Sequence, residues 1–189
     1  ELAYGVIRHK TRIDYYIELN SSQKLKNLSV WIISILRTGV YQILFLDKIP
    51  NFAAINESVK LAKRYGHDAS ARYVNAVLRA IAKKGEIKIP SVEIFYSHPK
   101  WLVDMLYEQY PLEYKKILTA NNTVAPVTIR VNTLKTTPKM LCEKFAQQQI
   151  NAFAEGDILT ISKFGDISSL EEYKEGLFIP QDKAAYLAA

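Results

Sequence analysis

The sequence predicts two modules, an all-α helical bundle followed by a small α+β subdomain. Two observations support this fold class. The apolar residues recur with a helical period up to about residue 120 and alternate only beyond it. Charge is also divided unevenly, because residues 1–90 carry 15 Lys and Arg against 7 Asp and Glu, whereas residues 91–189 carry 10 against 12. This asymmetry indicates a basic first module facing a polyanion, with an ordinary soluble basic surface as the alternative.

Composition narrows the class of protein further. Hydrophobic residues make up 49% and charged residues 23% of the 189, which is typical of a globular protein. No apolar run approaches the roughly 20 residues that a membrane span needs, so no membrane partner is expected. The first residues lack the layout of a secretion signal, and the single cysteine, Cys142, has no internal partner. A cytoplasmic location is therefore predicted.

The first module is predicted to contain one central helix and two amphipathic ones. Segment 29–50 predicts a helix buried on nearly all sides, with Gly39 marking a close crossing by another helix. Segments 51–66 and 70–85 predict helices that end at Gly66 and Gly85. The residues at inward helical spacing are Ile32, Leu36, Val40, Ile43 and Asp47 in the first helix, Phe52, Ile55, Val59 and Ala62 in the second, and Val74, Val77, Leu78 and Ile81 in the third.

Both amphipathic helices place cations on the side opposite the apolar stripe. These residues are Lys60, Lys63, Arg64 and His67 on one helix and Arg72, Arg79 and Lys83 on the next. An ordinary solvated face explains either helix taken alone. Two successive basic faces favour a phosphate-binding surface.

The stretch "IPNFAAINESVKLAKRYGHDASARYVNAVLRAIAK" resembles the NusB-type helical domain. "ELAYGVIRHKTRIDYYI" is similar to an earlier helix of that domain, with Gly5 and Arg8 in a Tyr-Gly-x-x-Arg arrangement. The resemblance implies an all-helical bundle that contacts RNA, proteins or both. It also implies that a first helix upstream of Glu1 is absent.

The second half begins with a predicted helix and then changes period. Ser97 or His98 followed by Pro99 indicates a helix start, and Trp101, Leu102, Met105 and Leu106 form the expected apolar stripe. His98 lacks any accompanying nucleophile or carboxylate pattern, so a capping or packing role is expected rather than catalysis.

Beyond residue 126 a strand is predicted, in which Val127, Ile129 and Val131 alternate with Thr128, Arg130 and Asn132. A helix follows, with Thr136 or Thr137 as cap, Pro138 as first residue and Leu141, Phe145 and Ala146 inward, and a strand pair completes the unit. Cys142 on this helix is expected to be a small packed side chain rather than a nucleophile.

"YSHPKWLVDML", "ILTANN", "IRVNTLK" and "EGLFIPQDKAAYLAA" occur in an order similar to the Sun or RsmB family of bacterial RNA cytosine-5 methyltransferases, which modify small-subunit ribosomal RNA. In that family a NusB-like domain precedes an RNA-recognition-motif-like domain and then the methyltransferase. The implied layout is a NusB-like domain at 1–86, a linker at 87–97, a helical connector with the α+β subdomain at 98–180, and a leading helix at 181–189. The last motif departs from the family at Lys183, Ala184 and Ala185.

The resemblance also implies where the chemistry lies. In the family, the Gln-Asp segment at Gln181 opens a helix that packs on the S-adenosylmethionine-binding sheet, and the two active-site cysteines lie beyond it, so Cys142 matches neither. The mechanism that the resemblance implies for the whole enzyme is covalent, in which a thiolate adds to the cytosine ring before methyl transfer. The chain is therefore expected to hold no catalytic, cofactor-binding or metal-binding residue and to be inactive alone, with ribosomal RNA and its own downstream methyltransferase domain as partners.

The residues expected to contact RNA are basic helix positions and two polar strand positions. They are Arg8, Arg12, Lys60, Lys63, Arg64, Arg72, Arg79 and Lys83 as phosphate contacts, and Arg130 and Asn132 on the strand. For the last two, a structural role in bracing the strand is equally expected. The alternative functions are a free-standing antitermination-type adapter that binds RNA and protein, and a purely protein-binding helical scaffold.

Overall fold

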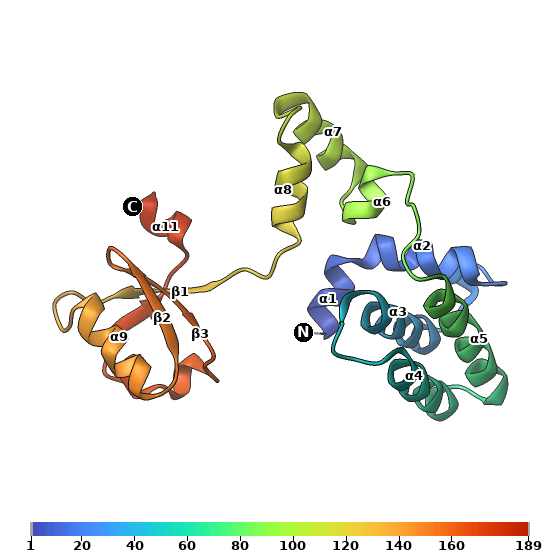
Figure 1. Cartoon of the computed structure of the whole chain (residues 1–189), viewed down its shortest axis with the longest axis horizontal. Helices are drawn as coiled ribbons and strands as arrows, with labels where there is room; N and C mark the ends of the chain where they lie inside the picture. Colours follow the sequence, from blue (N-terminus) through green and yellow to red (C-terminus); the bar gives the residue numbers. More distant parts are fainter. Residues whose placement is uncertain (1, 189) are drawn as a thin grey trace. The chain divides into compact units, whose positions relative to one another are not determined.

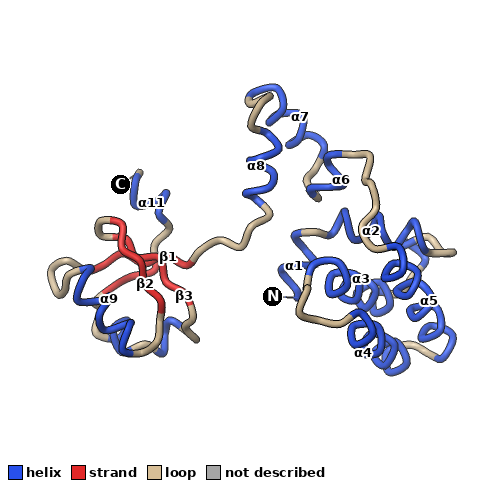
Figure 2. Tube along the Cα trace, in the orientation of Figure 1, coloured by secondary structure: helices blue, strands red, loops and turns tan. Residues whose placement is uncertain are grey.

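A computed structural model describes residues 2–188, and the chain divides into two compact units, Glu1–Thr123 and Val124–Ala189. The first unit is helical throughout and the second combines helices with a sheet (Figures 1 and 2), which confirms the predicted fold class. The first unit carries 18 Lys and Arg against 11 Asp and Glu, and the second 7 against 8. The excess positive charge therefore belongs to the helical unit.

The helical unit is a bundle followed by three shorter helices. Its elements are α1 Leu2–Arg8, α2 Lys10–Asn20, a 3-10 turn at Leu25–Asn27, α3 Val30–Phe45, α4 Asn51–Tyr65, α5 Asp68–Lys84, α6 Val92–Tyr96, α7 Lys100–Gln109 and α8 Tyr114–Asn121. The segment expected as one early helix is thus two, separated at His9. The predicted domain boundaries at residues 86 and 97 stay a prediction.

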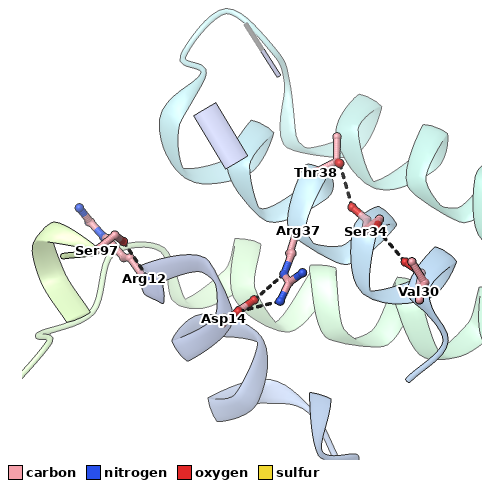
Figure 3. Close-up of polar contacts among 7 residues, drawn as sticks. All are labelled: Arg12, Asp14, Val30, Ser34, Arg37, Thr38 and Ser97. Atoms are coloured by element: carbon pink, nitrogen blue, oxygen red, sulfur yellow. Dashed lines mark hydrogen bonds and ion pairs between the residues drawn. The ribbon is translucent and has the colours of Figure 1, made fainter. Parts of the chain in front are cut away.

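Helix α3 is the centre of the bundle, because α1, α2, α4 and α5 all pack against it. The predicted close crossing at Gly39 is confirmed, since a Cβ there would lie 2.8 Å from both the Leu78 Cδ1 and the Ser58 Oγ atoms. The Arg37 guanidinium fixes α3 to α2 through two bonds to the Asp14 carboxylate, of 2.7 Å from Nε and 2.8 Å from Nη2 (Figure 3).

Two predictions for this part of the bundle are wrong. Phe52 is 70% exposed rather than inward. The buried residues of α4 are instead Ala54, Ile55, Ser58 and Ala62, and Ser58 is the one that meets Gly39. Phe52 lies two positions before Ala54, about 200° away from it around the helix, so it falls outside the buried side. Asp47 lies beyond the end of α3 and is exposed.

The start of α3 also departs from the expectation that this helix is buried nearly all round, because Val30 and Trp31 are exposed. Helix α5 follows its prediction: Val74, Val77, Leu78 and Ile81 are all buried. It ends at Gly85, whose φ of 62° is a left-handed conformation that a glycine adopts without steric cost.

The short helices α6 to α8 share a small core of their own, built on Val103, Leu106 and Leu118. The predicted stripe on α7 is wrong for Trp101, which is 67% exposed, and for Met105, which is also exposed. The apolar contact of α7 is confined to this small core, so only its Leu102, Val103 and Leu106 side is covered. The helix starts after Pro99 without a side-chain cap, and Ser97 ends α6 in a left-handed conformation.

The second unit is a four-stranded antiparallel sheet with helices. Its elements are β1 Val127–Val131, α9 Pro138–Gln147, β2 Asn151–Glu155, β3 Ile158–Ser162, a 3-10 turn at Ile167–Ser169, α10 Glu171–Lys174, β4 Phe178–Pro180 and α11 Lys183–Leu187. The strand order is β2-β3-β1-β4, with Thr128 opposite Thr160 and Arg130 opposite both Ile158 and Ile179.

One face of this sheet packs on α9 to form the core, in which Ile129, Leu141, Phe145, Leu159 and Phe178 are all fully buried. The Thr137 hydroxyl caps α9 by accepting from the Met140 N–H, as expected for one of the two threonines. Ala146 is exposed, contrary to prediction, because only the Leu141 and Phe145 side of α9 meets the sheet.

No helix within residues 2–188 combines the length and the apolar character needed to cross a membrane.

Candidate nucleic-acid interface

Helix α5 carries a straight stripe of three cations, Arg72, Arg79 and Lys83, all exposed. They lie seven and four residues apart, which places them on one line about 10 Å and 6 Å apart along the axis, opposite the buried side. The Arg79 Nε donates to the Asn75 Oδ1 over 3.0 Å. Within residues 2–188 none of the three forms an ion pair. We call these residues the α5 stripe.

The cations of α4 are exposed as well but have acidic neighbours. The Lys60 Nζ lies 2.7 Å from a Glu57 oxygen, and the Lys63 Nζ lies 3.5 Å from an Asp68 oxygen. Exposed pairs of this kind contribute at most about 1 kcal/mol, so a phosphate could replace the carboxylate. The Arg64 guanidinium lies 5.5 Å from the centre of the Tyr65 ring.

Arg12 occupies a different environment, with a side chain only 12% exposed. Its guanidinium lies 4.7 Å from the Phe95 ring centre, 5.2 Å from the Phe45 ring centre and 3.0 Å from a Glu86 oxygen. Its backbone N–H donates to the Ser97 Oγ over 2.9 Å (Figure 3). Arg12 therefore fastens α6 to the bundle and is not open to a phosphate. Arg8, at the end of α1, is partly buried.

His9 lies beside Arg12, with its ring stacked 4.3 Å from that of Phe45. Burial lowers the pKa of His9 from 6.5 to about 4, and the positive charges of Arg12 and Arg8 add to the effect. The imidazole is therefore neutral at physiological pH. It adds no positive charge to the surface.

The two strand residues differ from each other. The Asn132 side chain is engaged on both sides, since its Nδ2 donates to the Gly176 carbonyl over 2.9 Å and its Oδ1 accepts from the Leu134 N–H over 3.2 Å. Asn132 thus braces two loops. Arg130 is exposed, and its guanidinium lies 5.2 Å from the centre of the Tyr186 ring on α11.

Helix α11 lies against the sheet on the face away from α9. Besides the Arg130 contact, the Lys183 ammonium pairs with the Glu155 carboxylate of β2. Arg130 and Glu155 both lie opposite Ile158 in the sheet, and Ile158 is buried although it belongs to this face. The strand face around Arg130 is therefore partly covered.

An aromatic pair not identified from the sequence lies where the start of α3 meets the end of α4. The Trp31 and Tyr65 rings stack with centres 4.9 Å apart and an angle of 14° between their planes. The helical period predicted that the segment of Trp31 was buried nearly all round, and nothing in the sequence marked Tyr65. The one available signal was position, since Trp31 lies near the start of one predicted helix and Tyr65 near the end of the next.

Cys142 has the environment of a packed side chain. Cys142 is partly buried on α9, where burial, and then the Glu143 carboxylate, raise the pKa of its thiol. A thiol that stays protonated is a poor nucleophile, which agrees with the expected packing role. No group of three or more His, Cys, Asp or Glu side chains that could hold a metal ion occurs within residues 2–188.

Two family models match successive parts of the chain. The NusB family matches residues 1–83, and the family described as "Methyltr_RsmF/B-like, ferredoxin-like domain" matches residues 98–167. The first match contains α3 to α5 with the α5 stripe, and the second contains the sheet as far as β3.

The chain is also similar along its whole length to curated proteins. It is 32% identical to the probable ribosomal RNA small subunit methyltransferase B of Bacillus subtilis, covering all of this chain and 44% of that protein. It is 30% and 32% identical to the ribosomal RNA small subunit methyltransferases B of Pseudomonas putida and Vibrio cholerae, with 45% of each covered. The chain thus spans less than half the length of these relatives.

A solved structure shares the fold. The crystal structure of PH0851 superposes with a TM-score of 0.74 at 20% identity, covering 98% of this chain and 44% of that one.

Proposed function

We propose that the two regions that match the NusB family and the RsmF/B-like ferredoxin-like domain together form the RNA-targeting part of a ribosomal RNA methyltransferase. The single observation that carries this proposal is the order of the two domains within one chain. It is supported by the similarity of the entire chain to three proteins named small subunit methyltransferase B. The finer proposal is that the whole enzyme methylates carbon 5 of a cytosine in small-subunit ribosomal RNA, in the cytoplasm.

The methyl donor proposed for the whole enzyme is S-adenosylmethionine, and the residues of this chain do not fit it. A nucleotide-type cofactor is held by a glycine-rich turn between a strand and a helix, at the edge of a parallel sheet. Among residues 2–188 every strand pairing is antiparallel, and the turn from β1 to α9, residues 132–137, contains no glycine. We therefore assign to this chain the holding of RNA and no step of the methyl transfer.

The α5 stripe is the part of the surface best suited to the task. Its three cations have no acidic partner among the described residues, so a bound phosphate displaces only counterions, and that release drives binding. Phosphate contacts fix the position and register of a protein on RNA without reading its sequence. The α4 cations extend the set to six charges in two adjacent helices.

An antitermination-type adapter is the alternative function for a NusB-like bundle. The ferredoxin-like match over residues 98–167 favours the methyltransferase, because that family description refers to methyltransferases and an adapter has no evident use for the second unit.

The proposal is tested by titrating the chain with a fragment of small-subunit ribosomal RNA at several salt concentrations. If three to six phosphates are neutralised, the logarithm of the binding constant should fall against the logarithm of the salt concentration with a slope of about −2 to −4, at roughly −0.7 per phosphate. An absence of binding at the lowest salt concentration would overturn the proposal.

A further inference from the structure

The Trp31 and Tyr65 rings form an aromatic step on the surface of the helical unit. Trp31 lies in the first turn of α3 and is 59% exposed, while Tyr65 is the last residue of α4 and is 44% exposed. Large rings are usually covered in a folded protein, and exposed apolar groups that gather in one place commonly mark a binding site. The rings are stacked on each other, so each has one face covered, and the outer face of the pair is a preformed flat surface for a further ring.

A groove of about 240 Å³ runs from this step between α3 and α4. Its apolar wall includes Ile35 and Leu61. The Ser34 hydroxyl donates to the Val30 carbonyl and the Thr38 hydroxyl to the Ser34 carbonyl, over 2.7 and 2.8 Å (Figure 3). Because the hydroxyl protons are committed to the helix, these oxygens can only accept. The groove therefore suits a flat, partly apolar group with N–H donors at its edge.

Positive charge adjoins the groove on α4. The Arg64 guanidinium lies 5.5 Å from the centre of the Tyr65 ring, and Lys60 and Lys63 are exposed on the same helix. The carboxylate of Glu57, which also lines the groove, is compensated by the Lys60 Nζ at 2.7 Å. A ligand that places a flat ring on the aromatic step can thus place an anionic group at the neighbouring cations.

We infer that this groove is a stacking site for an unpaired base of single-stranded RNA, with Trp31 and Tyr65 as the platform and Arg64 at the adjoining phosphate. The inference rests on the proposed function and adds a second kind of contact to it. Flat bases with amino groups at their edges and phosphates on either side match the three features of the site. Lys60 and Lys63 already have acidic partners, but an apolar protein helix would leave the Arg64 guanidinium without an anionic one, so this charge favours RNA.

Fluorescence tests the site directly, because the chain contains only two tryptophans. Trp101→Phe leaves Trp31 as the only indole, and the probe is an oligoadenylate of about 12 nucleotides that follows the site sizes of single-strand binders. Stacking should quench the Trp31 emission, with a titration curve that matches the binding measured by anisotropy of labelled RNA. Binding by anisotropy with unchanged Trp31 emission would overturn the inference.

Substitution gives a second, independent readout. Trp31→Ala should weaken oligoadenylate binding by about 5- to 150-fold, the range for loss of one base stack, while the salt slope stays the same because no phosphate contact is lost. Trp101→Ala is the matched control, since Trp101 is 67% exposed and lies on α7 outside the groove. Circular dichroism and thermal unfolding establish that each variant is folded, and Tyr65→Ala replaces Trp31→Ala if that variant unfolds.

The outcomes separate the inference from the proposed function. If Trp31→Ala and Trp101→Ala bind RNA equally well, the groove is not an RNA site and serves a protein partner or none, although RNA binding by the cations stands. If the unsubstituted chain binds no RNA, the proposed function itself fails.

Discussion

Arg12 provides the sharpest distinction between a structural and an RNA-binding cation, and Arg12→Ala should destabilise the helical unit without altering RNA contacts. The substitution removes two ring contacts, at 4.7 and 5.2 Å, and one ion pair with the exposed Glu86 carboxylate. At about 1 kcal/mol for each ring contact and about 0.5 kcal/mol for the ion pair, the expected loss is about 2.5 kcal/mol. For a unit of this size that corresponds to a fall in melting temperature of roughly 10 °C.

Thermal unfolding followed by circular dichroism measures the loss, and two further variants isolate its cause. Glu86→Gln should cost less than about 1 kcal/mol because it removes only the exposed pair. Arg72→Ala on the open surface should change stability by no more than about 0.5 kcal/mol. At a temperature where all variants are folded, Arg12→Ala should show the salt slope of the original chain. A melting temperature within about 2 °C of the original, together with a flattened slope, would identify Arg12 as a phosphate contact and refute this reasoning.

Two further predictions concern the bundle. The pKa of His9 is about 4 in the folded chain and 6.5 is its ordinary value, so the unfolded chain takes up a proton first as the pH falls. The free energy of unfolding should therefore drop by about 1 to 2 kcal/mol between pH 7 and pH 5. Urea titrations at the two pH values measure this drop, and in His9→Gln it should be smaller by the same amount. Gly39→Ala should destabilise the bundle by about 1 to 2 kcal/mol despite the better helix propensity of alanine, because the new Cβ would meet Leu78 and Ser58 at 2.8 Å. A variant as stable as the original would show that α4 and α5 can move away from α3 at no cost.

The regular parts of the fold follow from local sequence signals. Alternation predicted β1, and apolar spacing with a terminal glycine predicted α5, since both patterns depend only on which side of one element is buried. The failures arise where a second element decides burial. Phe52 points outward because the contact of Ser58 with Gly39 sets which side of α4 is buried, and Trp101 is exposed because the small core of α6 to α8 covers only one side of α7.

In the candidate site, too, some residues could be placed from a single helix and others depend on distant parts of the chain. Spacing alone aligned the three cations of the α5 stripe, because their line is a property of one helix. The role of Arg12 depends on two phenylalanines that lie 33 and 83 positions along the chain, and that of Asn132 depends on a loop 44 residues away. No local pattern carries that information. The Trp31 and Tyr65 pair was missed for the same reason.

The central claim, that the α5 stripe holds RNA through its phosphates, is tested most directly by comparing two double variants with equal loss of charge. Arg72→Gln/Arg79→Gln removes two cations of the stripe, and Lys115→Gln/Lys116→Gln removes two exposed cations of α8 in the same unit. Binding to a small-subunit ribosomal RNA fragment is measured across salt concentrations for both. The stripe variant should flatten the salt slope by about 1 to 1.5 units while sequence preference is retained, and the α8 variant should leave the slope unchanged. Equal slopes for the two variants would contradict the claim and show that the cations of the stripe are ordinary solvated charges.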